Sequence, residues 1–173
     1  MLFLELLLWL AIGIVAISLG EWTLHRFLMH RRWWLHRAVC TVDGIWRRHT
    51  VLHHHKYYKR FDHEPDEHGR HVNITLNPLQ TAMYGIPAAL LAAHLSPLGG
   101  VVIACLVIGH HVAWDALHTE MHMPAGTWFS RTAAYRFLRQ YHLDHHRHTG
   151  YNFNVVVPLA DYLMGTHWPT GKV

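Results

Sequence analysis

The pattern of apolar and polar positions divides the chain into long apolar stretches and polar blocks that are rich in histidine. Residues 2–19 are apolar apart from Glu5 and Ser18. As a helix they would measure about 27 Å, close to the thickness of the hydrocarbon core of a bilayer. The stretch lacks the basic segment and the cleavage site of a signal peptide. It therefore predicts a retained transmembrane helix over residues 1–20, which continues beyond the membrane and presents His25 just outside it.

A second apolar block covers residues 79–117 and contains a strong turn signal. Residues 79–95 and 98–117 are each long enough to cross a bilayer, and Ser96-Pro97-Leu98-Gly99-Gly100 separates them. We therefore predict a transmembrane hairpin. With the first helix this gives an all-α integral membrane protein with about three transmembrane helices. Residues 61–72 are polar and predict a loop, in which we expect His63, His68 and His71 to be solvated.

The basic residues predict how the chain is oriented in the membrane. All but one of the 15 Lys and Arg lie in residues 26–70 or 131–147, and none lies in 1–25 or 71–130. Basic blocks that flank charge-free apolar stretches follow the positive-inside rule. We therefore expect the N-terminus outside and residues 21–78 and 118–173 in the cytoplasm, as one domain over 1–173. This placement argues against a nucleic-acid partner, although the net charge is +4.

Ten of the 20 histidines lie in four clusters beside the apolar stretches. If residues 131–148 are helical, His142, His145 and His146 have i, i+3, i+4 spacing and share one face. Imidazole is a good ligand for iron, zinc and copper, so such a face is typical of part of a metal site. Ten clustered donors would suffice for two divalent ions with about five ligands each. The ten are His25, His30, His49, His53, His54, His118, His122, His142, His145 and His146.

Neutral ligands leave the charge of a metal ion uncompensated, so nearby carboxylates should matter. We expect Asp115, Glu120 and Asp144 to orient imidazole N–H groups from behind the ligands. His111 lies four residues before Asp115 on the same helical stripe and is a further candidate for this role. The isolated histidines His36, His148 and His167 are expected to be solvated, and His94 to lie near the hairpin tip.

These segments resemble the fatty acid hydroxylase superfamily of integral-membrane di-metal oxygenases, from about residue 21 to residue 166. The resemblance rests on LHRFLMH at 24–30, HTVLHH at 49–54, WDALHTEMH at 114–122, YHLDHH at 141–146 and NFNVVVPLADYLMGT at 152–166. The third segment, with an Asp three residues before its first His, is most similar to the fatty acyl 2-hydroxylase branch.

The resemblance implies a function, a fold and a set of ligands. The ten histidines would hold two iron ions, with zinc as a possible substitute and without haem, in a cytoplasmic helical cap. The substrate would be a lipid from the bilayer, specifically a fatty acyl chain that is hydroxylated with dioxygen. The electrons would come from an external donor of the ferredoxin or cytochrome b5 type.

Several alternatives stay open at the level of the sequence. The second cluster has three residues between its first His and the His pair, where two are commoner, and it is followed by His55. Its ligands could therefore be His49, His53 and His54, or could include His55. A carotenoid ring hydroxylase or a lipid desaturase could use the same scaffold. A membrane metal-binding or transport protein would also be rich in histidine, whereas a membrane cytochrome would use two axial histidines and leave the others idle.

Overall fold

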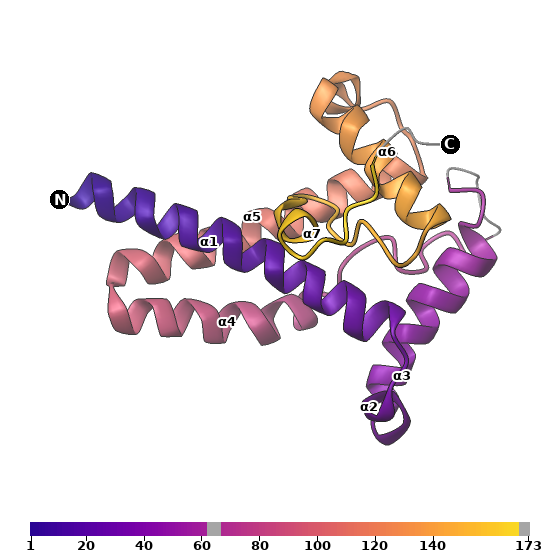
Figure 1. Cartoon of the computed structure of the whole chain (residues 1–173), viewed down its shortest axis with the longest axis horizontal. Helices are drawn as coiled ribbons and strands as arrows, with labels where there is room; N and C mark the ends of the chain where they lie inside the picture. Colours follow the sequence, from indigo (N-terminus) through magenta and orange to yellow (C-terminus); the bar gives the residue numbers. More distant parts are fainter. Residues whose placement is uncertain (62–66, 170–173) are drawn as a thin grey trace.

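The computed structural model describes residues 1–61 and 67–169, and this part of the chain is helical without strands (Figure 1). The prediction of an all-α fold is therefore confirmed for the described residues; His63 lies outside them. The elements in chain order are α1 (Leu2–Leu24), η1 (His25–His30), α2 (Trp34–Ala38), α3 (Cys40–Trp46), η2 (Arg47–Tyr57), α4 (Pro78–Leu95), α5 (Pro97–His122), η3 (Trp128–Arg131), α6 (Ala133–Arg147) and α7 (Leu159–Leu163).

Helices α1, α4 and α5 form an elongated apolar arm, and the remaining elements gather at one end of it (Figure 1). The N-terminus and the α4–α5 turn lie together at the opposite end. There Ser96 Oγ donates a hydrogen bond to Glu5 Oε1 at 2.5 Å. Inside the arm, Ile103 and Val107 of α5 pack against Trp9 of α1. This packing places the C-terminal ends of α1 and α5, where the histidines begin, side by side.

Two helical segments are long and apolar enough to cross a membrane, namely Leu2–His30 and Pro97–His122, with mean hydropathies of 2.5 and 1.6. Many of their large apolar side chains, such as Leu8 and Ile108, are exposed. Helix α4 is not among these candidates. It has no charged residue, but Gln80, His94 and two prolines make it less apolar. Two of the three expected crossings therefore meet this test of length and composition.

The turn between α4 and α5 is shorter than the sequence predicts. Ser96 alone separates the two helices and caps α5 by accepting a hydrogen bond from the Gly99 amide. Gly99 and Gly100 belong to α5 and are buried. A Cβ atom at Gly99 would lie 2.3 Å from the ring of Trp9. These glycines are therefore explained by close packing between helices rather than by a turn.

This packing predicts that Gly99→Ala destabilises the protein, by about 1–3 kcal/mol as is usual for overpacking. The bulky ring of Trp9 would have to move away from the new methyl group. Gly109→Ala is a matched control on the same helix, because a Cβ atom there meets nothing within 4 Å. Thermal melting in detergent should show a lower Tm for Gly99→Ala only. Equal melting of the two variants would contradict the packing described here.

Candidate metal centre

All ten clustered histidines converge at the end of the apolar arm. They come from four separate elements of the chain, η1, η2, α5 and α6. They form two groups whose ring nitrogens lie within 4.8 Å of one another. The first group consists of His25, His30, His49, His54 and His145. The second consists of His53, His118, His122 and His142, and His146 joins it beside His53 and His54.

In the first group, five Nε2 atoms face a common point. The Nε2 atom of His49 lies 2.8 Å from that of His25, 3.0 Å from that of His30 and 3.1 Å from that of His54. The Nε2 atom of His145 lies 3.0 Å from that of His30. Nitrogens that bind one ion at ~2.0–2.1 Å lie roughly 3 Å apart. The spacing of the five nitrogens therefore fits a single cation between them.

The second group contains buried nitrogens that have no hydrogen-bond partner among the described residues. They include Nε2 of His53, Nε2 of His118 and both ring nitrogens of His146. The Nε2 atoms of His122 and His142 lie 3.1 Å apart. An unsatisfied buried polar atom costs about 1–3 kcal/mol, unless something else binds it. These orphaned nitrogens fit a second metal ion.

The two His-His pairs divide their members between the two groups. Consecutive residues of a helix are turned by about 100° from each other. On α6, His142 and His146 are one turn apart and belong to the second group, whereas His145 points to the first. On η2, His53 and His54 are divided in the same way. Adjacent histidines thus serve two neighbouring metal positions.

Two segments of the site are π-helical rather than α-helical. In an α-helix, residues five apart are turned by roughly 140° from each other, so His25 and His30 would point apart. In a π-helix the hydrogen bonds run from i to i+5, and such residues come close together. The segment η1 places His25 and His30 in one group, and η2 does the same for His49 and His54. The sequence predicts helices here, but its spacing alone does not distinguish the two helix types.

Backbone carbonyl groups contact five of the ten rings through Nδ1, on the side opposite to Nε2. The Nδ1 atom of His53 lies 3.1 Å from the Val72 carbonyl oxygen, and the Nδ1 atom of His118 lies 2.8 Å from the Ile74 oxygen. The corresponding distances are 2.7 Å from His122 to the Phe61 oxygen and 2.6 Å from His145 to the Tyr151 oxygen, and Nδ1 of His25 contacts the Phe153 oxygen. A carbonyl only accepts hydrogen bonds, so these Nδ1 atoms carry the proton. The Nε2 atoms are therefore left free to bind metal.

Asn73 contacts one further ring, that of His49 in η2. Its side-chain amide lies 2.7 Å from Nδ1 of His49. The amide oxygen is the group that can accept from Nδ1–H when Nε2 binds a metal. Asn73 has a positive φ of 54°, a conformation that asparagine tolerates better than most residues. The sequence pattern does not identify Asn73, because its contact with His49 depends on the backbone turn in which Asn73 lies.

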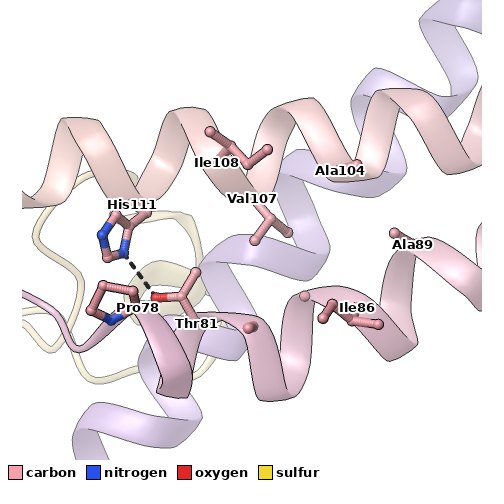
Figure 2. A pocket seen from close by; sticks show the side chains of 10 residues that line it. Pro78, Thr81, Ile86, Ala89, Ala104, Val107, Ile108 and His111 are labelled. Atoms are coloured by element: carbon pink, nitrogen blue, oxygen red, sulfur yellow. Dashed lines mark hydrogen bonds between the residues drawn. The ribbon is translucent and has the colours of Figure 1, made fainter.

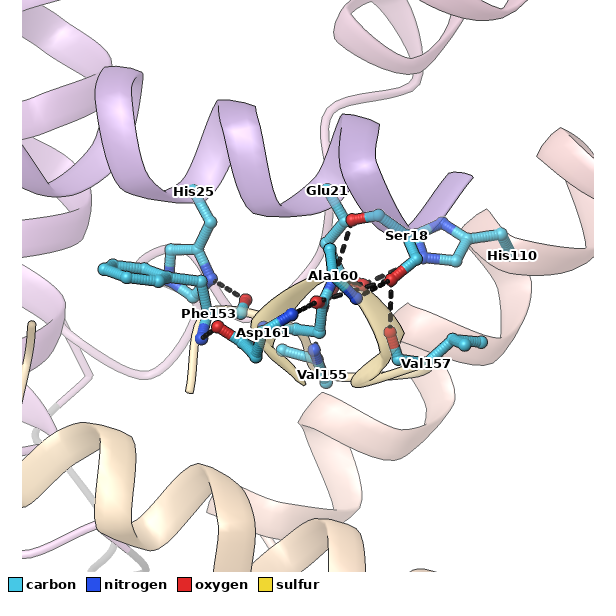
Figure 3. Close-up of polar contacts among 10 residues, drawn as sticks. Ser18, Glu21, His25, His110, Phe153, Val155, Val157, Ala160 and Asp161 are labelled. Carbon is cyan, nitrogen blue, oxygen red and sulfur yellow. Dashed lines mark hydrogen bonds and ion pairs between the residues drawn. The ribbon is translucent and has the colours of Figure 1, made fainter. Parts of the chain in front are cut away.

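The C-terminal segment 151–166 supplies two of the five carbonyl groups and is fixed by buried side chains. Asp161 accepts hydrogen bonds from the amides of Phe153 and Asn154, at 3.0 and 2.8 Å, and from Thr166. Asn152 bonds the Tyr141 carbonyl at 3.0 Å. The segment thereby holds the Phe153 carbonyl against the His25 ring (Figure 3).

Glu21 ties this C-terminal segment to α1, and sequence analysis missed it. Its carboxylate accepts a hydrogen bond from the Val155 amide at 2.7 Å and one from the Asn154 side chain at 3.1 Å. His110 Nε2 lies 3.2 Å from the same carboxylate (Figure 3). Ser18, one turn earlier on α1, donates to the Val157 carbonyl at 2.7 Å. The sequence signal that could have identified this contact is the pair of polar residues, Ser18 and Glu21, at the end of a long apolar stretch.

The carboxylates expected behind the ligands have other hydrogen-bond partners in the described part of the chain. Asp115 accepts from the Leu76 amide at 2.7 Å and lies 3.5 Å from His111 Nε2. Glu120 accepts from the amides of residues 125–127. Asp144 accepts from Gln140 at 2.9 Å. Backbone carbonyls thus occupy the position that we expected for these side chains, and an effect of the four residues on bound metal stays a prediction.

The other histidines lie outside both groups. His55, His68 and His71 are exposed, so the structure places His49, His53 and His54 of the second cluster at the centre without His55. His94 is exposed near the hairpin tip. The expectation for His36 was wrong. This side chain is buried. Its Nε2 atom donates a hydrogen bond to the Leu28 carbonyl at 3.0 Å, which links α2 to η1.

Burial keeps the imidazoles in the form that binds metal. Removal from water lowers the pKa of His145 to about 4, partly offset by the bond to the Tyr151 carbonyl. Burial, followed by the nearby His146 ring, lowers the pKa of His54 well below its ordinary value. For His53 burial acts in the same direction, reinforced by His118. The rings are therefore neutral at pH 7, and a metal ion need not displace protons from them.

Histidine groups at the ends of apolar helices that could hold metal ions are the arrangement that the resemblance to the fatty acid hydroxylase superfamily implies. The comparison with known proteins confirms this resemblance. The chain is 27% identical over 161 residues to a dihydroceramide fatty acyl 2-hydroxylase of Arabidopsis thaliana. The match covers 90% of the chain and 59% of that relative's length. No family model matches the chain, and no solved structure matches it significantly.

The geometry predicts two metal ions per chain and a specific dependence on His145. His145→Ala removes one nitrogen of the first group and leaves the others unable to close around an ion. We expect elemental analysis of the purified variant to show the loss of at least one ion, with membrane insertion unchanged because the apolar helices are untouched.

His68→Ala is the matched control, since His68 is exposed and outside both groups. This variant should retain both ions. One ion or none in carefully prepared wild-type protein would count against a double centre, and so would full metal content in His145→Ala.

Proposed function

We propose that this protein is a membrane-bound di-iron oxygenase that hydroxylates a C–H bond of a fatty acyl lipid. The observation that carries the proposal is the convergence of ten histidines into neighbouring groups whose ring nitrogens lie close together. Its support is the similarity to a dihydroceramide fatty acyl 2-hydroxylase. The substrate and the activity are proposals, because the chain spans 59% of that relative's length.

The residues of this chain would have distinct roles in the reaction. The ten histidines would hold the ions, and backbone carbonyls such as those of Tyr151 and Ile74 orient five of the rings. Phe61 and Phe153 pack against the rings and exclude water. The chemistry that a bound iron pair supplies is the activation of dioxygen for attack on an unactivated C–H bond.

The overall reaction needs electrons from outside the chain. One C–H bond and the O–O bond break, while one C–O bond, the O–H bond of the hydroxylated product and two O–H bonds of water form. Two electrons and two protons are consumed together with one dioxygen molecule. We propose that the electrons come from a separate donor protein of the ferredoxin or cytochrome b5 type.

We also propose a complete topology of three crossings. Helix α4 runs antiparallel to α5 along its length and packs against it through Ala92. The 18 residues of α4 correspond to about 27 Å, so α4 would cross wherever α5 does. The Glu5–Ser96 bond places the hairpin tip beside the N-terminus. With the basic residues at the opposite end, the metal centre would face the cytoplasm and the N-terminus would lie outside.

The proposed function predicts a lipid product that is heavier by one oxygen atom. Cells that express the wild-type protein under ¹⁸O₂ should accumulate a fatty acyl lipid with one ¹⁸O atom, detected by mass spectrometry. His145→Ala should reduce this product at least a hundredfold, and His68→Ala should form it at the wild-type level.

The alternative reactions give different products. A lipid that is lighter by two hydrogens would indicate a desaturase, and an oxygenated carotenoid would indicate a ring hydroxylase. Either result would overturn the proposed reaction while leaving the metal centre intact. The absence of any oxidised lipid in cells with a suitable donor would overturn the oxygenase proposal as a whole.

The topology predicts which positions can be labelled from outside intact cells. Cys40 and Cys105 are both exposed and are first replaced by Ser. A new cysteine at Leu95, which is 70% exposed at the hairpin tip, should react with an impermeant maleimide. One at Arg60, exposed beside η2, should react only after the cells are opened. The reverse pattern would invert the orientation, and labelling of both positions would exclude the hairpin.

A further inference from the structure

An open apolar groove lies between α4 and α5, away from the metal centre (Figure 2). Its volume is about 310 Å³. Gly85, Ile86 and Ala89 line it from α4, and Ala104, Val107 and Ile108 line it from α5. The two isoleucines are 58% and 65% exposed, so the groove opens on the outer face of the hairpin. In a helix pair that crosses a bilayer, this face meets lipid hydrocarbon.

The groove has a polar end and an apolar end. Thr81 and His111 lie at the end nearer to the metal centre, and Thr81 Oγ1 is 2.9 Å from His111 Nδ1 (Figure 2). Towards Ala89 and Ala104 the lining contains only carbon side chains and glycine. From Pro78 to Ala89 the groove extends about 16 Å, roughly half of the ~30 Å thickness of the hydrocarbon core. Its length therefore matches one leaflet, the depth occupied by a single acyl chain.

A second, smaller cavity lies beyond this polar end, beside one of the clustered histidines. It has a volume of about 50 Å³ and is lined by His25, a member of the first histidine group, together with Glu21 and Trp114. Thr81 lines both cavities and stands between them. Thr81 thus borders both the groove and the cavity beside His25, a candidate metal ligand.

We propose that the α4–α5 groove binds the hydrocarbon tail of the acyl substrate, with its methyl end beside Ala89 and Ala104. The occupant is a single acyl chain, because the lining offers polar atoms only at one end and the groove opens on the outer face of the hairpin. The head of the lipid then lies beyond Thr81. This inference rests on the proposed function, since it names the site that holds the substrate of that reaction.

The proposed binding mode has a consequence for the position of attack. His118 follows His111 by seven residues of α5, about 10 Å along the helix axis. A chain whose distal part occupies the groove presents its polar end to the centre. The carbon that reacts is therefore one close to the acyl head group rather than one near the methyl end.

Photo-crosslinking tests the groove without requiring any turnover. Palmitic acid with a diazirine at its methyl end is added to the full chain in phosphatidylcholine nanodiscs. We expect saturable labelling at residues 86–89 and 104–108, which excess unlabelled palmitate prevents. Protein stripped of metal by a chelator should be labelled in the same way. This readout separates the groove from the reaction, because the site would be labelled even if no lipid is oxidised.

Ala104→Phe fills the groove and should reduce the saturable labelling at least tenfold. Cys105→Phe is its matched control, because Cys105 is exposed and does not line the groove. In active protein, Ala104→Phe should shift the preferred substrate to shorter chains while metal content stays at two ions per chain. Ile108→Ala, which enlarges the groove without a steric clash, should shift the preference to longer chains.

Two outcomes would overturn the inference. One is saturable labelling that maps outside α4 and α5, or that is equal in Ala104→Phe and Cys105→Phe. The other is an unchanged chain-length profile in both Ala104→Phe and Ile108→Ala. If lipid oxidation fails but saturable labelling is lost only in Ala104→Phe, the groove is supported and the oxygenase reaction is not.

Discussion

The structure depends on holding ten neutral imidazoles with their Nε2 lone pairs directed at each other. At 2.8–3.2 Å such pairs attract only if one ring carries a proton at Nε2, and one proton cannot satisfy five nitrogens. The rings are therefore held from behind. His25, His53, His118, His122 and His145 each bond a backbone carbonyl through Nδ1. A bound cation would replace the repulsion between these Nε2 lone pairs with attraction. Metal binding should therefore contribute directly to the stability of this end of the molecule.

This arrangement explains which parts of the site could be predicted from sequence. The i, i+4 pairs His118/His122 and His142/His146 lie on regular α-helices, where spacing alone defines a shared face. The helical arm follows from apolar runs in the same way. The i, i+5 pair His25/His30 depends on π-helical geometry, which cannot be predicted from the spacing of the histidines. The carbonyl acceptors are also hidden, because every residue has one and only the fold determines which of them faces a ring.

The polar residues of α1 show why the C-terminal segment is needed. A carboxylate and a hydroxyl on an apolar helix are costly in a membrane unless they are bonded. Glu21 and Ser18 bond backbone groups of residues 155 and 157, so each element satisfies the polar groups of the other. The same segment carries the Phe153 carbonyl to His25. The bonds that anchor the C-terminal segment to α1 therefore also orient the His25 ring.

The two His-His pairs make the two metal positions interdependent. Since His53 and His54 are neighbours in η2, a shift of that helix that improves one group displaces a nitrogen of the other. His145 and His146 impose the same restriction from α6. The helices η2 and α6 thus fix the separation of the two groups. An ion bound in the first group would order both helices, and the second group would then lose less conformational freedom when it binds its own ion. Binding of the two ions should therefore be positively coupled.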